Sequence, residues 1–229
     1  MKDMEKNLIN INSYLDSLIS ACKAAFSDRL IYVGLQGSYL RGEENEDSDI
    51  DIMLILDHFS VEDMDAYRAI LKRIGHYEKS CGFICGKDDM ARWNPLEVCQ
   101  LKHTTKDLLG RLSDYLPSAS RQDEINYVKL GVGNLYHELC HRYIHSDREK
   151  NIRKLRNSGK AAFFLIQNLY YLESGIFAAT KRELLALVTE EDSEMLSLGD
   201  LGEGYDFDKA FRCAFQWCRN ALYRLDRMT

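Results

Sequence analysis

The sequence predicts an α+β protein in two parts, a small mixed β-sheet with helices followed by a helical bundle. Apolar, β-branched runs at 30–33 and 50–56 indicate buried strands, and helical periodicity surrounds them. After Pro117, apolar residues recur only at helical spacing, and no strand signal of comparable strength follows. We therefore predict a first domain over 1–115 and a second over 116–229.

The first domain is expected to alternate helices and strands. An amphipathic helix is predicted where apolar residues recur every three or four positions, and the first strand is predicted to end at Gly34. Together these elements form an α/β sandwich. The predicted helices are 4–26 and 61–74, and the predicted strands are 30–33, 50–56, 81–85 and 96–101.

The second domain is expected to be helical throughout. Three segments rich in Leu, Phe, Tyr and Ala have helical spacing: 121–146, 153–178 and 206–227. The glycine-rich stretch 197–204 is the clearest loop in this half.

Composition and charge restrict the class of function. The chain is 45% hydrophobic and 29% charged, with a formal net charge of −6. A dedicated nucleic-acid binder needs a basic surface, so no stable nucleic-acid complex is expected. A small anionic substrate is still compatible, because a few local cations and a metal can hold a triphosphate.

The compartment is expected to be the cytoplasm. No stretch approaches the roughly 20 consecutive apolar residues of a membrane-spanning helix. The charged N-terminal segment lacks the apolar run of a secretory signal. The seven cysteines do not form a disulfide or zinc pattern, and we interpret most of them as small buried side chains in a reducing compartment.

The most informative stretch pairs a small-residue turn with two acidic residues. Asp49 and Asp51 lie two residues apart at the start of the second predicted strand, so their side chains share one face of the sheet. Adjacent carboxylates repel each other unless a cation lies between them, and Mg²⁺ prefers oxygen ligands. Gly37 and Ser38 directly follow the first strand, where a phosphate can approach the backbone and the serine hydroxyl.

The run from Gly37 to Ile52 resembles the signature of the nucleotidyltransferase superfamily, which includes polymerase β-like enzymes, minimal nucleotidyltransferases and antibiotic nucleotidyltransferases. That pattern is Gly-Ser/Gly, about ten residues, then Asp-hydrophobic-Asp/Glu-hydrophobic. Ten residues separate Ser38 from Asp49 here. The second half, through its stretches 160–164 and 180–185, is more weakly similar to the C-terminal helical domain of bacterial antibiotic-modifying members.

The resemblance implies transfer of a nucleoside monophosphate from a nucleoside triphosphate, with ATP the expected donor, to a hydroxyl acceptor, releasing pyrophosphate. It assigns Asp49 and Asp51 as catalytic residues that hold Mg²⁺, and Gly37 and Ser38 as nucleotide-binding residues. The expected acceptor is a small molecule similar to an aminoglycoside antibiotic. The alternatives are a protein side chain, as in nucleotide-transferring antitoxins, and a non-catalytic nucleotide-binding regulatory module. A homodimer is compatible with each of these.

Two further nucleotide contacts are proposed, each with an ordinary alternative. Arg41 would grip phosphates, or it would pair with a glutamate of its acidic loop, Glu43 or Glu44. Lys160 would reach the triphosphate from the second domain, or it would be an ordinary lysine on a helix surface.

Family members usually place a third acidic residue on a later strand, as a metal ligand or a general base. Glu97 is the candidate here because apolar residues flank it in the predicted strand 96–101. The alternative is a solvent-facing strand residue.

A rival motif lies in the second domain. His137, Glu138 and His141 match the zinc-protease pattern His-Glu-x-x-His, and His145 lies one turn further along. Three imidazoles at this spacing would share one side of a helix and could bind zinc. The alternative is a polar helix face.

Overall fold

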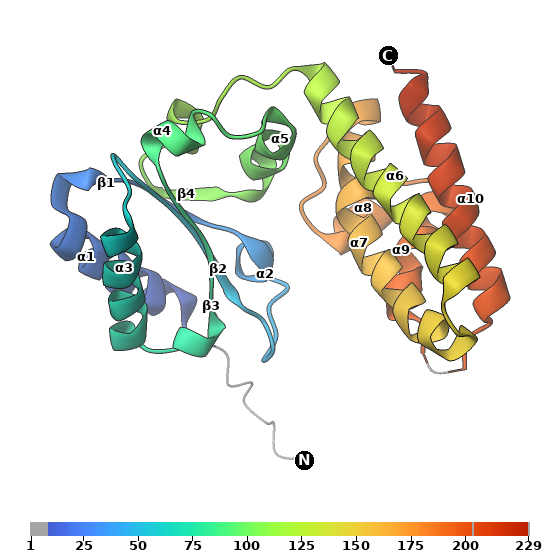
Figure 1. The fold of residues 1–229 in the computed structure, drawn as a ribbon, viewed down its shortest axis with the longest axis horizontal. Helices are drawn as coiled ribbons and strands as arrows, with labels where there is room; N and C mark the ends of the chain where they lie inside the picture. Colours follow the sequence, from blue (N-terminus) through green and yellow to red (C-terminus); the bar gives the residue numbers. More distant parts are fainter. Residues whose placement is uncertain (1–8, 203, 229) are drawn as a thin grey trace. The chain divides into compact units, whose positions relative to one another are not determined.

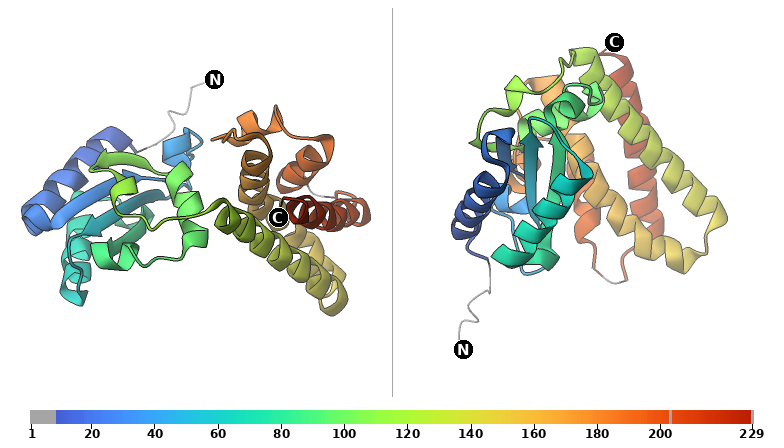
Figure 2. Two further views of the ribbon diagram at one scale, coloured as in Figure 1. Left: turned by 90° about the horizontal axis from the view of Figure 1, so that it is seen from above. Right: turned by 60° about the vertical axis from the view of Figure 1, so that its left-hand side comes forward.

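The computed structural model describes residues 9–202 and 204–228. The chain forms two compact units, which we call the first unit (Met1–Ser118) and the second unit (Ala119–Thr229). Figures 1 and 2 show the fold of each. The predicted α+β class is confirmed: a mixed sheet with helices is followed by a helical region.

A four-stranded mixed sheet forms the centre of the first unit, in the order β3-β2-β1-β4. β1 pairs antiparallel with both of its neighbours, whereas β2 and β3 are parallel. The strand β1 continues past Gly34, which is paired with Met53. The strands are β1 (Leu30–Leu35), β2 (Ile50–Leu56), β3 (Ser80–Gly86) and β4 (Lys106–Leu109).

Helices cover both faces of this sheet (Figure 1). On one face, α1 (Ile11–Phe26) and α3 (Val61–Ile74) pack against alternate side chains of β1 and β2. On the other face, a smaller core forms around Tyr32, Met53 and Met90. Asp51 belongs to this second face by strand alternation, because Met53 and Ile55 lie there. Asp51 thus lies on the face with the smaller core.

The first helix begins later than predicted. The Asn10 side chain accepts a hydrogen bond from the Ser13 amide (3.1 Å), so the helix begins at Ile11, after this N-cap. Of the predicted helix 4–26, residues 4–8 lie outside the described residues. The prediction for α3 agrees with the structure at both ends, because Ser60 and Asp63 form a capping box before Val61.

The predicted strand 96–101 is wrong, because this segment lies in α5 (Pro95–Thr104). Asn94 caps the helix by accepting a hydrogen bond from the Leu96 amide (3.1 Å), and Pro95 occupies the first turn. These start signals outweigh the short apolar run. The fourth strand is instead β4, which was not predicted.

The remaining elements of the first unit are short. They are α2 (Gly37–Arg41), α4 (Lys87–Met90) and the 3-10 helices η1 (Ser27–Arg29), η2 (Tyr77–Lys79) and η3 (Leu112–Asp114).

The second unit is helical in its described residues. The three predicted helices correspond to its three longest helices, and the predicted loop 197–204 contains one 3-10 helix, η4 (Leu198–Asp200). The α-helices are α6 (Arg121–His145), α7 (Arg148–Ser174), α8 (Lys181–Leu185), α9 (Glu190–Ser197) and α10 (Phe207–Asp226). None of the helices in the described parts of the chain combines the length and apolarity required to traverse a bilayer.

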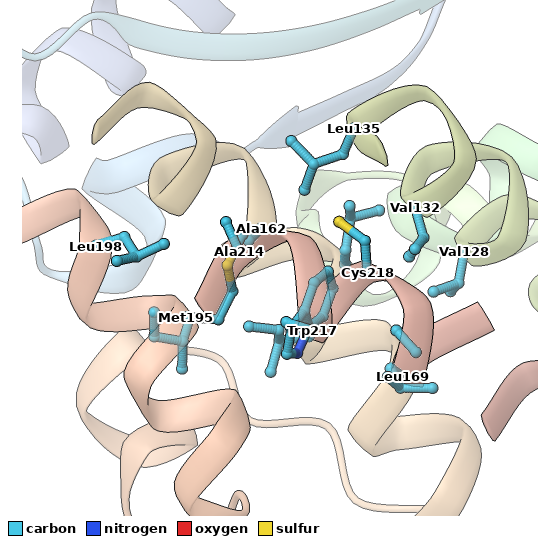
Figure 3. Close-up of a cluster of buried hydrophobic side chains, with 14 of the residues drawn as sticks. Val128, Val132, Leu135, Ala162, Leu169, Met195, Leu198, Ala214, Trp217 and Cys218 are labelled. Carbon is cyan, nitrogen blue, oxygen red and sulfur yellow. The ribbon is translucent and has the colours of Figure 1, made fainter. Parts of the chain in front are cut away.

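The core of the second unit is built around Trp217, whose ring is fully buried between helices (Figure 3). Its indole N–H donates to buried Asp192 (2.7 Å), which also accepts hydrogen bonds from Arg224 (2.8 and 3.1 Å). Arg224 also pairs with Glu173 of α7 (2.6 Å). This network connects α7, α9 and α10.

Candidate active site

The turn after β1 lies against the Asp51 carboxylate. The Gln36 amide donates to the Asp51 carbonyl (2.9 Å), which places the following residue, Gly37, beside β2. Gly37 has φ of +69°, and a Cβ atom at this position would overlap Asp51 Oδ2. Only glycine combines this backbone conformation with so close an approach. The structure therefore brings two of the predicted site residues together.

Asp49 and Asp51 interact electrostatically at the start of β2. Asp49 is exposed and immediately precedes the strand, whereas Asp51 is half-buried. Burial raises the pKa of Asp51; a hydrogen bond from Cys81 lowers it, the charge of Asp49 raises it and Arg41 lowers it. A half-buried carboxylate whose ionisation is disfavoured by a neighbouring carboxylate suits a divalent cation, and carboxylate oxygens are the donors that Mg²⁺ prefers.

Ser38 lies in the first turn of α2 and is half-buried. Its carbonyl accepts hydrogen bonds from the Gly42 and Glu43 amides, which close the short helix. Tyr39, the next residue, is buried in the core against α1 and β1. This anchor holds the turn close to Asp51.

A tight loop joins α2 to β2 and sets the distance between Ser38 and Asp49. The Asn45 carbonyl accepts from the Ser48 amide (3.0 Å), and the Ser48 hydroxyl accepts from the Asn45 amide (2.9 Å). The Asn45 side chain also accepts from the Asp47 amide (2.9 Å). Lys79 donates to the Glu46 carbonyl and ties the loop to the segment before β3.

Arg41 lies near the carboxylates and is ion-paired. Its Nε donates to Glu43 Oε2 (2.8 Å), which is the alternative expected from the acidic loop. Its charge nevertheless lowers the pKa of Asp51. Arg41 thus adds positive potential at the site, and a contact with phosphate would compete with Glu43.

Cys81 is a site residue that the sequence did not reveal. β3 runs parallel to β2 with Cys81 level with Asp51, and the Cys81 thiol lowers the pKa of the Asp51 carboxyl. We expected most cysteines to be buried, but Cys81 is exposed. Its strand, Ser80–Gly86, contains no acidic residue. The pairing of β3 with β2 was the missing information, since the spacing of residues along the chain does not contain it.

Glu97 is not on a strand. It is an exposed residue in the first turn of α5, and its carboxylate accepts a hydrogen bond from the Trp93 indole (2.7 Å). Trp93 in turn packs edge-on against Phe83 of β3, with ring centroids 4.9 Å apart. The prediction that Glu97 lies on a strand is therefore wrong, and its role as a general base remains a prediction.

Lys160 belongs to the second unit, where it is an exposed residue of α7. Its contact with a triphosphate remains a prediction.

The histidines of the rival zinc motif are exposed on one side of α6. Ring centroids are 5.9 Å apart for His137 and His141, and 4.9 Å apart for His141 and His145. Glu138 pairs with Arg142 (3.1 Å). Among the residues that the structure describes, these side chains do not form a group able to hold a metal ion.

The region around Asp49 and Asp51 is similar to known proteins. Residues 15–84 match the family described as "Nucleotidyltransferase domain". A 60-residue segment is 35% identical to "Putative protein adenylyltransferase MJ1305" of Methanocaldococcus jannaschii. This alignment covers 26% of the chain and 41% of that relative, so the chain matches less than half of the relative's length.

The fold is similar over almost the whole chain to a solved structure. That structure is the spectinomycin adenyltransferase AAD(9) from Enterococcus faecialis, solved with ATP and spectinomycin. The superposition includes 94% of this chain and 99% of the adenyltransferase chain. The TM-score is 0.58 and the sequence identity is 11%. At this identity the similarity shows a shared fold.

Proposed function

We propose that this chain transfers a nucleoside monophosphate from a nucleoside triphosphate to a hydroxyl acceptor and releases pyrophosphate, because residues 15–84 match the nucleotidyltransferase-domain family. One observation carries the proposal: the half-buried Asp51 carboxylate lies against Gly37 and within electrostatic range of Asp49. That arrangement combines a cation-binding pair with a turn whose backbone a phosphate can approach.

The residues of the first unit have distinct roles in this proposal. Asp49 and Asp51 hold Mg²⁺, and Gly37 and Ser38 bind the outer phosphates. When bound, the cation supplies positive charge to the triphosphate oxygens and to the leaving pyrophosphate. Arg41 adds a second positive charge near the phosphates.

The transfer is an in-line displacement at the α-phosphorus. The acceptor oxygen forms a bond to phosphorus, the bond to the bridging oxygen of pyrophosphate breaks, and the hydroxyl proton passes to a base. Glu97, which lies on helix α5, remains the candidate base. Lys160 of the second unit remains a candidate phosphate contact.

Glu97→Gln tests that assignment. We expect turnover to fall by about 100-fold, within the usual range for a lost general base, while nucleotide affinity is unchanged. Trp93→Phe is the matched control, because it removes the indole hydrogen bond to Glu97 but leaves the carboxylate. Unchanged turnover in Glu97→Gln would remove Glu97 from the mechanism.

The acceptor we favour is a small hydroxylated molecule with cationic groups, similar to an aminoglycoside antibiotic. Two observations support it: the net charge of −6 and the fold shared with a spectinomycin adenyltransferase. A protein acceptor is the alternative, supported by the archaeal relative's name. A cytoplasmic location would provide the triphosphate.

The experiment that tests the function is a screen of the four triphosphates with Mg²⁺ against small hydroxylated molecules and intact proteins. Pyrophosphate release is measured, and mass spectrometry locates the added monophosphate. Asp49→Asn is the matched negative control, with activity expected to fall by at least about 100-fold. Nucleotide binding without pyrophosphate release in every mixture would instead indicate a regulatory module.

A further inference from the structure

We propose that Cys81 is a positioning residue that holds the Asp51 carboxylate in the orientation needed for the cation. This inference rests on the proposed function, because it concerns the same site. Nothing in the family comparison assigns a role to this cysteine.

The strand register puts Cys81 directly beside Asp51. In the parallel pair, Asp51 is level with Cys81 and Met53 with Phe83. Paired residues on neighbouring strands are about 4.8 Å apart and project from the same face. The Cys81 thiol is therefore placed to act as a hydrogen-bond donor toward the Asp51 carboxylate.

Asp51 thereby has a close neighbour on each side, one in the turn after β1 and one in β3. On the β1 side, the Gly37 backbone lies so close to Asp51 Oδ2 that no Cβ atom fits between them. On the β3 side lies the Cys81 thiol. A carboxylate held on two sides has few rotamers available, so little conformational entropy is lost when a cation binds.

A thiol suits this position for a chemical reason. One S–H donor occupies one of about four acceptor sites of a carboxylate, so the others remain available to a cation. A neutral thiol also adds no negative charge beside Asp49 and Asp51. A third carboxylate there would add repulsion in the absence of the cation.

The test compares Cys81→Ala with Cys81→Ser by Mn²⁺ binding, measured by electron paramagnetic resonance with ATP present. Mn²⁺ reports on a Mg²⁺ site because both ions prefer oxygen ligands. We expect Cys81→Ala to weaken Mn²⁺ binding about fivefold, the effect of one net hydrogen bond. Cys81→Ser retains a donor and should restore affinity to within about twofold of wild type.

Cys85→Ala is the matched control. Cys85 lies on the same face of the same strand, but it is buried in the smaller core and away from Asp51. We expect Cys85→Ala to lower thermal stability while Mn²⁺ affinity is unchanged. This control separates a role at the carboxylate from a general effect on β3.

Two results would overturn the inference. Cys81→Ala could bind Mn²⁺ as tightly as wild type, or Cys81→Ser could bind it as weakly as Cys81→Ala. A wild-type protein that binds no Mn²⁺ and releases no pyrophosphate would instead refute the proposed function, and this inference with it. Circular dichroism confirms that each variant is folded before binding is compared.

Discussion

At the residue scale, Asp51 combines a functional role with a cost to stability. Its folded pKa lies above the ordinary value of 3.8, first because of burial and then because of Asp49. The folded state therefore binds the proton more tightly than the unfolded chain does. Stability falls as pH rises from about 3.8 through the raised pKa, and the penalty is fully present at neutral pH.

Asp51→Asn should therefore raise the melting temperature of the metal-free protein at pH 7 while abolishing pyrophosphate release. Calorimetry in a chelator at several pH values measures the effect. The difference from wild type should disappear as the pH falls below 3.8, where the Asp51 carboxyl is protonated in both the folded and the unfolded state. A variant that is less stable than wild type at pH 7 would contradict this account.

Gly37 provides a second prediction at this scale. Gly37→Ala should lower activity by about 100-fold, because its methyl group must displace Asp51, and small misplacements of reacting groups are costly. Gly42→Ala is the matched control. Gly42 has nearly the same φ, +67° against +69°, but open space around its Cβ position.

Both alanines carry a similar backbone strain of about 1–2 kcal/mol. Steady-state kinetics should therefore separate the variants even where thermal melting does not. Equal losses of activity would mean that strain in the turn, rather than displacement of Asp51, controls activity.

At the element scale, sequence signals predicted most of the first unit. Helix α3 and strand β2 have the predicted bounds, because a capping box marks the start of α3 and five consecutive apolar residues (52–56) mark β2. The prediction for 96–101 failed because a six-residue segment with four apolar residues suits either a strand or a helix, and the Asn94-Pro95 start signal decides between them. Local patterns identify elements with strong end signals.

In the candidate site, too, some contacts could be predicted from local sequence and others could not. The closeness of Gly37 and Asp51 follows from a motif that is continuous in the sequence. The contact between Cys81 and Asp51 depends on which strands pair, and in which register. A single sequence does not contain that information in any local pattern.

Helix packing in the second unit gives an element-scale prediction. A Cβ atom at Gly159 of α7 would overlap the backbone of η4 at Gly199. Gly159→Ala should therefore destabilise the protein by about 1–3 kcal/mol, the usual cost of overpacking. Gly133→Ala in α6 should instead stabilise it by about 0.5–1 kcal/mol, because nothing lies within 4 Å of that Cβ position.

Urea denaturation of both variants measures these two changes. The opposite signs are the critical result. Destabilisation by both substitutions would mean that helical glycines in this unit are needed for a reason other than close packing.

At the scale of the whole molecule, each unit has a core of its own. One cluster of buried apolar residues lies in the second unit, and two lie on the two faces of the sheet in the first. The two tryptophans of the chain are divided between the units: Trp93 belongs to the first and Trp217 to the second. Each can therefore report on the unfolding of its own unit.

We expect Gly159→Ala to lower the urea midpoint reported by Trp217 fluorescence in a Trp93→Phe background. The midpoint reported by Trp93 in a Trp217→Phe background should change little, because Gly159 contributes only to the second core. Equal shifts for both reporters would show that the chain unfolds as one cooperative body.

The loop closed by Asn45 and Ser48 has a consequence for evolution and for engineering. Two of its three internal hydrogen bonds are accepted by the Asn45 and Ser48 side chains, whereas Glu46 and Asp47 take part through backbone groups. The residue types at 46 and 47 are therefore free to change, whereas the length of the loop is not. A deletion of one residue would move Asp49 relative to Ser38 even if every remaining side chain were kept. Among divergent descendants of this chain, the number of residues between Ser38 and Asp49 should therefore be kept more often than the residue types in that interval.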